Sequence, residues 1–111
     1  MKRRSLKELQ GAVESATGRT KKALALYALA VFHDNNSREA EAIPSYQQAI
    51  RLGLERKYEA MARAWLASSL YKAGRSREAQ KQISVASKLV QNPRLKKFLV
   101  GLAKRIEKKA A

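Results

Sequence analysis

Two stretches of this sequence carry the same pattern of small and large residues, 37 positions apart. Residues 29–49 read LAVFHDNNSREAEAIPSYQQA, and residues 66–86 read LASSLYKAGRSREAQKQISVA. In each stretch the shared Leu-Ala is followed by an alanine, then by a large residue four positions after that alanine, and then by a second alanine three positions later. In the first stretch these residues are Ala42, Tyr46 and Ala49. Small residues at matched positions let helix backbones approach closely, while the large residue fills the space between them. The pattern is therefore typical of stacked helical hairpins, whose repeats are about 34 residues long.

A shorter match follows a different spacing. The tetrapeptide Ser-Arg-Glu-Ala occurs at 37–40 and again at 76–79, which are 39 positions apart. The packing residues fit the 37-residue spacing better, so we interpret Ser37 and Ser76 as two independent helix caps. Val100-Gly101 follows Leu66-Ala67 after 34 residues and starts a third repeat that stops after one helix. We therefore expect the last helix to be a cap.

Apolar residues alternate three and four positions apart from Leu6 to Ala30, which predicts helix over about 5–34. Ser5 and Glu8 form a capping-box pattern at its start. The segment is either one long helix or two helices, and a break near Gly18 is favoured. Further helices are expected over about 38–52, 56–73, 77–91 and 93–109. Five or six helices joined by short turns imply an all-α fold with antiparallel neighbours.

Composition narrows the class of protein. The 111 residues fit one domain, and 45% of them are hydrophobic, which argues against disorder. Without cysteine, no disulfide or zinc–thiolate site is possible. The longest apolar runs are too short to span a membrane, and the basic N-terminus is too polar for a signal peptide. We expect a cytoplasmic protein.

The net charge of +15 is unevenly distributed along the chain. Residues 1–59 hold 11 basic and 7 acidic side chains, a net charge of +4, whereas residues 60–111 hold 13 and 2, a net charge of +11. A positive field of this size attracts nucleic-acid phosphates, anionic lipid or acidic protein segments. The alternative is a solvated face that only keeps the protein soluble.

At residues 33–54 the sequence resembles the tetratricopeptide repeat family, and most closely its bacterial group 5 type. The resemblance is carried by His33-Asp34, by the run from Arg38 to Ala42 and by the mid-helix Pro44. It covers about 23–102 and implies hairpins stacked in a right-handed superhelix with a concave protein-binding groove. It divides the chain into a basic N-terminal segment and helix, 1–22, and a repeat domain with a C-terminal capping helix, 23–111.

The resemblance also implies which residues line the groove, since these come from the first helix of each hairpin. The expected set is apolar and aromatic with a cationic edge: Tyr27, Val31, Met61, Trp65, Ser68, Tyr71, Lys72, Phe98, Leu102 and Arg105. For any of the aromatic residues, a place in the core is the alternative. Ser37 stands where the family usually has glycine, and the family's carboxylate-clamp residues are missing.

A second candidate surface is basic and lies in the C-terminal half. Its expected members are Arg75, Arg77, Lys81, Lys88, Arg94, Lys96, Lys97, Lys104 and Lys108. No RNA-binding motif accompanies them, so any nucleic-acid contact would be made to the phosphate backbone and would be sensitive to salt.

Catalysis finds little support. The single histidine, His33, precedes Asp34 at the end of an expected helix, and a structural role is favoured for it. Glycines are scattered and form no phosphate-binding loop. Neither a metal site nor a cofactor site is predicted.

The leading hypothesis is a non-catalytic adaptor whose groove binds an acidic or amphipathic segment of a protein partner. Two alternatives remain: an RNA- or ribosome-associated factor that uses the basic surface, and a self-associating module whose exposed repeat ends pair into a homo-oligomer.

Overall fold

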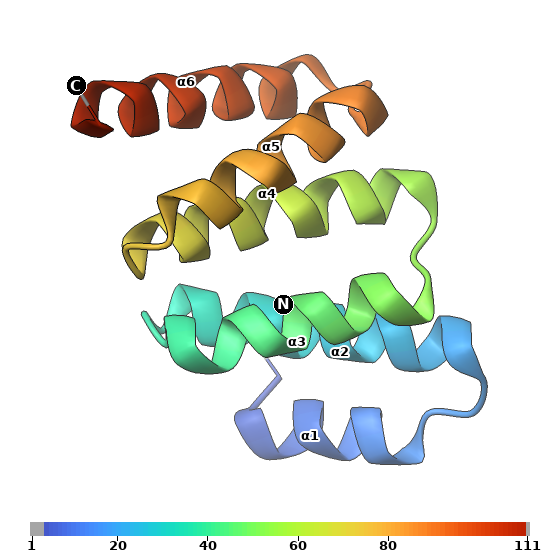
Figure 1. Ribbon diagram of the computed structural model, residues 1–111. Helices are drawn as coiled ribbons and strands as arrows, with labels where there is room; N and C mark the ends of the chain where they lie inside the picture. The colour runs from blue at the N-terminus through green and yellow to red at the C-terminus, as the bar shows by residue number, and fades with distance from the viewer. Residues whose placement is uncertain (1–3, 111) are drawn as a thin grey trace. The chain divides into compact units, whose positions relative to one another are not determined.

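The computed structural model describes residues 4–110, which hold six α-helices and no strand. Figure 1 shows them in chain order: α1 (Leu6–Ser15), α2 (Arg19–Asn35), α3 (Glu39–Leu52), α4 (Arg56–Lys72), α5 (Ser76–Leu89) and α6 (Pro93–Ala110). The predicted all-α class is confirmed, and each predicted helix is found within a few residues of its expected bounds.

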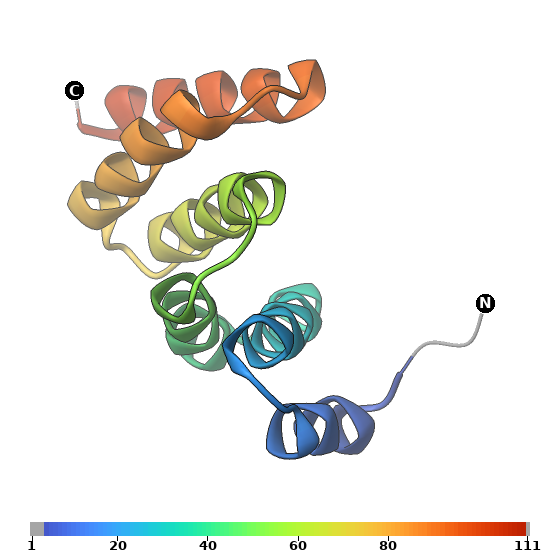
Figure 2. The same ribbon diagram turned by 90° about the vertical axis from the view of Figure 1, so that its right-hand side faces the viewer.

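The helices form two compact units, residues 1–54 and 55–111. In the first, α2 and α3 pair as an antiparallel hairpin and α1 packs on α2; in the second, α4 and α5 pair and α6 packs on both (Figure 2). Residue 23, where we expect the repeat domain to begin, lies inside α2. The first unit therefore joins α1 to the first hairpin.

Buried alanines hold each hairpin together. The first hairpin contains Ala23, Ala30, Ala42 and Ala49, the second contains Ala60, Ala67, Ala79 and Ala86, and none of the eight is more than 3% exposed. Each alanine of the first set precedes its counterpart by 37 residues. We call each set of four an alanine seam. The predicted helical hairpin repeat is confirmed, and the seam is its packing basis.

The turn inside each hairpin repeats as well. The amide of Arg38 donates to the carbonyl of His33 at 2.9 Å, and 37 residues later that of Arg75 donates to Leu70 at 2.8 Å. In both bonds the donor lies five residues after the acceptor, which closes a turn. In each turn the residue just before the arginine has a positive φ. That residue is Gly74 in the second hairpin, at +80°, and Ser37 in the first, at +57°.

The predicted serine caps are wrong. Ser37 occupies the positive-φ turn position, and α3 begins two residues later without a side-chain cap. Ser76 is the first residue of α5, which also lacks a side-chain cap. The two tetrapeptides therefore occupy different turn positions, whereas Arg38 and Arg75 precede α3 and α5 with nearly the same backbone angles.

Other predicted helix ends are confirmed. The break near Gly18 is real, since this residue has a φ of +85° and separates α1 from α2. The Ser5 and Glu8 capping box is formed in both directions. Pro93 opens α6, and Asn92 caps it by accepting a hydrogen bond from the Arg94 amide at 2.8 Å.

Helix α3 continues through Pro44. Proline has no amide to donate to the carbonyl of Ala40, one turn earlier. Both Pro44 and Ala40 are exposed, so the unpaired carbonyl lies on the solvent side of the helix. Water can satisfy it there, which explains why the helix tolerates the proline.

Helix α6 has two contrasting faces. Leu95, Leu99, Leu102 and Ile106 are buried against the second hairpin. The opposite face carries exposed lysines around Val100, which is 51% exposed. The apolar face of α6 is thus covered within the second unit, and the charged face is turned to solvent.

Ser37 and Gly74 occupy the same positive-φ position of the two hairpin turns, so exchanging serine and glycine there should change stability in opposite directions. A non-glycine residue in the left-handed region costs about 1–2 kcal/mol, against about 0.5–1 kcal/mol of extra backbone entropy for glycine. Ser37→Gly should therefore raise the free energy of unfolding by up to about 1 kcal/mol, and Gly74→Ser should lower it by a similar amount. Urea denaturation followed by circular dichroism measures both. Destabilisation by Ser37→Gly would show that the serine contributes more than its backbone strain.

Candidate functional site

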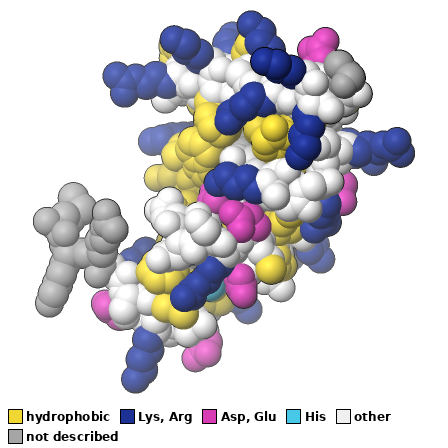
Figure 3. Space-filling view, turned by 90° about the vertical axis from the view of Figure 1, so that its left-hand side faces the viewer, with side chains coloured by type: hydrophobic (Ala, Val, Ile, Leu, Met, Phe, Trp, Pro, Cys, Tyr) yellow, Lys and Arg dark blue, Asp and Glu magenta, His cyan; other side chains and the backbone are white. Residues whose placement is uncertain are grey.

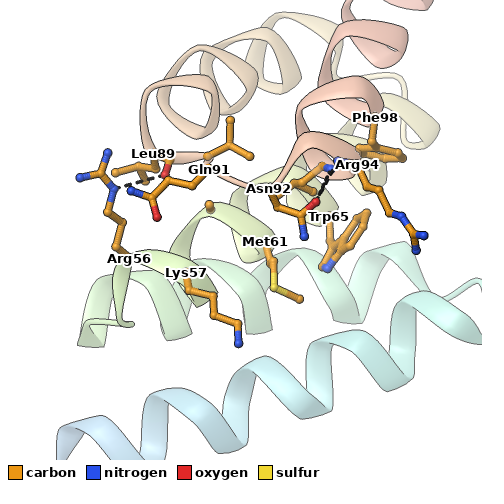
Figure 4. A pocket seen from close by; sticks show the side chains of 12 residues that line it. Arg56, Lys57, Met61, Trp65, Leu89, Gln91, Asn92, Arg94 and Phe98 are labelled. Atoms are coloured by element: carbon orange, nitrogen blue, oxygen red, sulfur yellow. Dashed lines mark hydrogen bonds between the residues drawn. The ribbon is translucent and has the colours of Figure 1, made fainter.

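The second unit contains a cavity of about 420 Å³ between α4, the end of α5 and the start of α6. Figure 4 shows its apolar wall, to which Met61 and Trp65 come from α4 and Phe98 comes from α6. Met61 and Trp65 are four residues apart, so both project from the same side of α4. A volume in this range is typical of small-ligand or side-chain binding pockets.

Two aromatic rings pack against each other in the wall of the cavity. The ring centroids of Trp65 and Phe98 are 5.0 Å apart, with an interplanar angle of 70°. This edge-to-face pairing stabilises such a contact by about 0.5–1.5 kcal/mol beyond area burial. Both side chains are only partly buried, so part of each ring remains available to a ligand.

An arginine fastens α4 to the end of α5 beside the cavity. The Nε and Nη2 groups of Arg56 donate to the carbonyls of Leu89 and Lys88, at 3.2 and 3.3 Å. These carbonyls belong to the last turn of α5, which has no further helical partner for them. In the first unit, Arg19 Nε donates to the carbonyl of Leu52 at 3.3 Å. The same bond thus recurs with both partners shifted by 37 residues.

The rim of the cavity is cationic. Lys57 and Arg94 line it, Gln91 and Asn92 add amides, and no aspartate or glutamate is found among its described lining residues. Lys57 Nζ lies 5.5 Å from the centroid of the Tyr58 ring. The residues around the cavity therefore favour a ligand that is apolar in part and negatively charged in part.

The expected groove residues separate into several groups. Met61, Trp65 and Phe98 line the cavity together. Ser68, Tyr71 and Lys72 lie further along α4, outside it, and Lys109 Nζ lies 5.2 Å from the centroid of the Tyr71 ring. Tyr27 and Val31 are partly buried on α2 of the other unit, and Arg105 is exposed on α6.

Leu102 requires a correction. Its side chain is 1% exposed, because it lies on the buried face of α6 and packs into the core of the second unit. It therefore cannot contact a partner as an open groove residue would. The apolar spacing in the sequence of α6 correctly predicts that Leu102 faces inward. It does not show whether an inward-facing residue belongs to the core or lines a groove.

Sequence reasoning missed several residues of the cavity. Arg56, Lys57 and Asn92 were not among the expected site residues, and Arg94 was expected only on the basic surface. A signal for Arg56 existed, since Arg19 precedes it by 37 residues. For the loop residue Asn92, the sequence indicated a helix start and nothing about a cavity.

The expected basic surface is exposed in all its members. Arg75 forms a bidentate ion pair with Glu78, with a shortest distance of 2.7 Å. Hydrogen bonding in this pair lowers the pKa of Glu78 and raises that of Arg75. Residues 55–111 hold 15 basic and 4 acidic side chains, a net charge of +11. In Figure 3, lysines and arginines project around the C-terminal helix.

His33 is a core residue. Its side chain is 7% exposed and its ring lies 6.0 Å from that of Phe32, edge to face. Its Nδ1 atom is buried and has no hydrogen-bond partner among the described residues. Nearby, the Tyr46 hydroxyl donates to Asp34 Oδ2 at 3.1 Å, and burial together with Asp34 raises the pKa of Tyr46 far above its usual value.

Within residues 4–110, no three His, Asp or Glu side chains are grouped so that they could hold a metal ion. No helix in this range is long and apolar enough to cross a membrane.

Comparison with known proteins identifies the family. Residues 23–94, about two thirds of the chain, match the family model described as tetratrico peptide repeat, in its group 5 type. The chain belongs to the tetratricopeptide repeat family. Neither a curated protein nor a solved structure gives a significant match. The matched residues run from α2 to the start of α6 and include both hairpins, while α1 and most of α6 lie outside the match.

The repeat comparison predicts the effect of replacing His33. The counterpart 37 residues later is Leu70, which is 1% exposed. An unsatisfied buried polar group costs about 1–3 kcal/mol, so His33→Leu should raise the free energy of unfolding by about 1–2 kcal/mol. Thermal and urea denaturation of this variant measure the change. The reverse variant Leu70→His serves as control and should destabilise; stabilisation by Leu70→His, or loss of stability in His33→Leu, would contradict the interpretation.

Proposed function

We propose that the chain is a non-catalytic protein-interaction module whose second-unit cavity binds a segment of a protein partner. Tetratricopeptide repeat domains are protein-binding modules, and the class of function follows from the family. The single observation that carries the choice of site is the partly exposed Trp65 and Phe98 pair beside a cavity with a cationic rim.

The lining of the cavity indicates the chemistry of the bound segment. Met61, Trp65 and Phe98 offer an apolar surface to a leucine, isoleucine or aromatic side chain. Lys57 and Arg94 favour aspartate or glutamate beside that anchor. Tryptophan and arginine are among the residue types that contribute most to interface affinity, and charges at a rim chiefly raise the association rate.

The basic surface of the second unit offers a competing use of the charge, the binding of RNA phosphates. Phosphate groups gain nothing from an apolar cavity, which is why the protein partner is preferred here. Phosphate-backbone binding also weakens steeply as salt rises, whereas an apolar anchor keeps its affinity. Salt dependence therefore separates the two functions, and sedimentation at two concentrations tests the self-association alternative.

A peptide selection tests the proposed function. A displayed peptide library is selected on the immobilised full chain at 0.5 M NaCl after nuclease treatment, and the selected peptides should combine apolar anchors with acidic residues. Trp65 is the only tryptophan, so its fluorescence should change when a selected peptide binds. Trp65→Ala should weaken binding of the labelled peptide by roughly 30-fold, the loss of about 2 kcal/mol typical of an interface hot spot.

The matched control is Val100→Ala, which removes an exposed apolar side chain on α6 outside the cavity. This variant should bind the peptide as the natural chain does. Equal losses in both variants, or retention of RNA alone with no peptide selected, would contradict the proposed function.

A further inference from the structure

The first unit has a cavity of its own, formed by α1, α2 and α3 and holding about 480 Å³. Three cations line it: Arg19 and Lys22 from the first turn of α2, and Arg51 from the last turn of α3. Val13, Leu26 and Leu52 form its apolar walls. None of these residues was expected to belong to a site, and none is involved in the proposed function.

The cations of this cavity are not neutralised within the described part of the chain. No aspartate or glutamate is found among the lining residues described, and no ion pair is formed by Lys22 or Arg51 in residues 4–110. Arg19 is held in place because its Nε group donates to the Leu52 carbonyl, as described above. That bond leaves its terminal nitrogens as donors at the cavity.

The second unit shows how the same positions look when the charge is balanced internally. The residues 37 positions after Lys22 and Leu26 are Glu59 and Arg63. Glu59 Oε2 and Arg63 Nε form an ion pair at 2.8 Å, and Arg63 also donates to Gln82 Oε1 at 2.9 Å. The first unit has a lysine in place of the glutamate and a leucine in place of the arginine. It thereby replaces an internal ion pair with one free cation beside an apolar wall.

Two of these cations, Arg19 and Lys22, lie where the helix dipole opposes them, whereas Arg51 lies in the last turn of α3, where the dipole favours a cation. The first turn of α2 carries Arg19 and Lys22 but no acidic residue, although the positive end of the helix dipole favours acidic side chains there. A bound carboxylate would compensate both the side chains and the helix end. The hydrogen bond to the Leu52 carbonyl accounts for Arg19, whereas no ion pair within residues 4–110 accounts for Lys22 at this position.

We propose that this first-unit cavity binds a peptide segment in which a glutamate or aspartate stands beside a leucine-like residue. The carboxylate would pair with Lys22, Arg19 and Arg51, and the apolar side chain would pack against the partly exposed Val13 and Leu52. A free phosphate or a nucleic-acid backbone would leave those apolar walls unused, which is why the occupant is assigned as a peptide. The site is separate from the second-unit cavity and does not depend on the function proposed for it.

A titration of the full-length ¹⁵N-labelled chain tests this site. The probe is the capped peptide acetyl-Leu-Glu-Glu-Leu-Glu-amide at 0.15 M NaCl, and amide shifts report the residues that respond. Saturable shifts are expected around Val13, Lys22 and Leu52. Lys22→Glu should weaken this binding at least tenfold, because it places a negative charge where the carboxylate binds.

The matched control is Lys21→Glu, which changes the net charge equally in the same helical turn but at a position outside the cavity lining. Consecutive side chains leave a helix about 100° apart, so the glutamate introduced by Lys21→Glu would not face the bound carboxylate directly, and this variant should lose clearly less affinity than Lys22→Glu. Lys22→Glu places an acidic residue at the start of α2, so it should not lower the thermal midpoint. A loss of binding in this variant therefore cannot be attributed to unfolding.

Three results would overturn the proposal: equal weakening by Lys21→Glu and Lys22→Glu, no saturable shifts in the first unit, or the same shifts at lower concentrations of inorganic phosphate or of a ten-residue oligothymidylate. The two cavities are tested independently. Trp65→Ala should leave the first-unit shifts unchanged, and Lys22→Glu should leave the fluorescence response of Trp65 unchanged.

Discussion

Close approach of two helix backbones at the alanine seam is the constraint on which the rest of each unit depends. An alanine side chain loses no rotamer freedom on burial, and its small size lets the two helices of a hairpin approach each other closely. A larger residue in the seam would cost about 1–3 kcal/mol through overpacking. This is why the seam recurs at the same 37-residue interval in both units while most other positions differ.

The seam also limits where the residues of the two cavities can lie. With one face of each helix fixed against its hairpin partner, the flanking faces of α2 and α4 are left to contact α1, α6 or a ligand. Arg19 and Arg56 lie at the start of the first helix of each hairpin. Each donates a hydrogen bond to a last carbonyl of the second helix and so holds these two helix ends together. Each cavity lies beside one of these arginine bonds, so the same local geometry shapes both sites.

Much of this fold was readable in the sequence because alanine spacing, glycine breaks and a capping box are local signals. The break at Gly18 and the start of α6 at Pro93 followed from such signals. The serine caps did not, because the decisive feature was the positive φ at Ser37, which depends on a turn closed five residues back. Of the site, Met61, Trp65 and Phe98 were predicted together, but Leu102 was misplaced. A helical face shows which residues point inward, and only tertiary contacts decide whether they meet core or cavity.

The two units carry different residues at many positions outside the alanine seam. Counterparts 37 residues apart include Ala28 and Trp65, Leu24 and Met61, Lys22 and Glu59, and His33 and Leu70. None of these eight is a seam residue, and three of them, Lys22, Met61 and Trp65, line a cavity. A repeat that holds its backbone with alanines can therefore change an anchor or a charge without disturbing the packing of the hairpin. The aromatic wall of the second unit and the uncompensated cations of the first unit are two such changes on one scaffold, and each is the basis of a different proposed site.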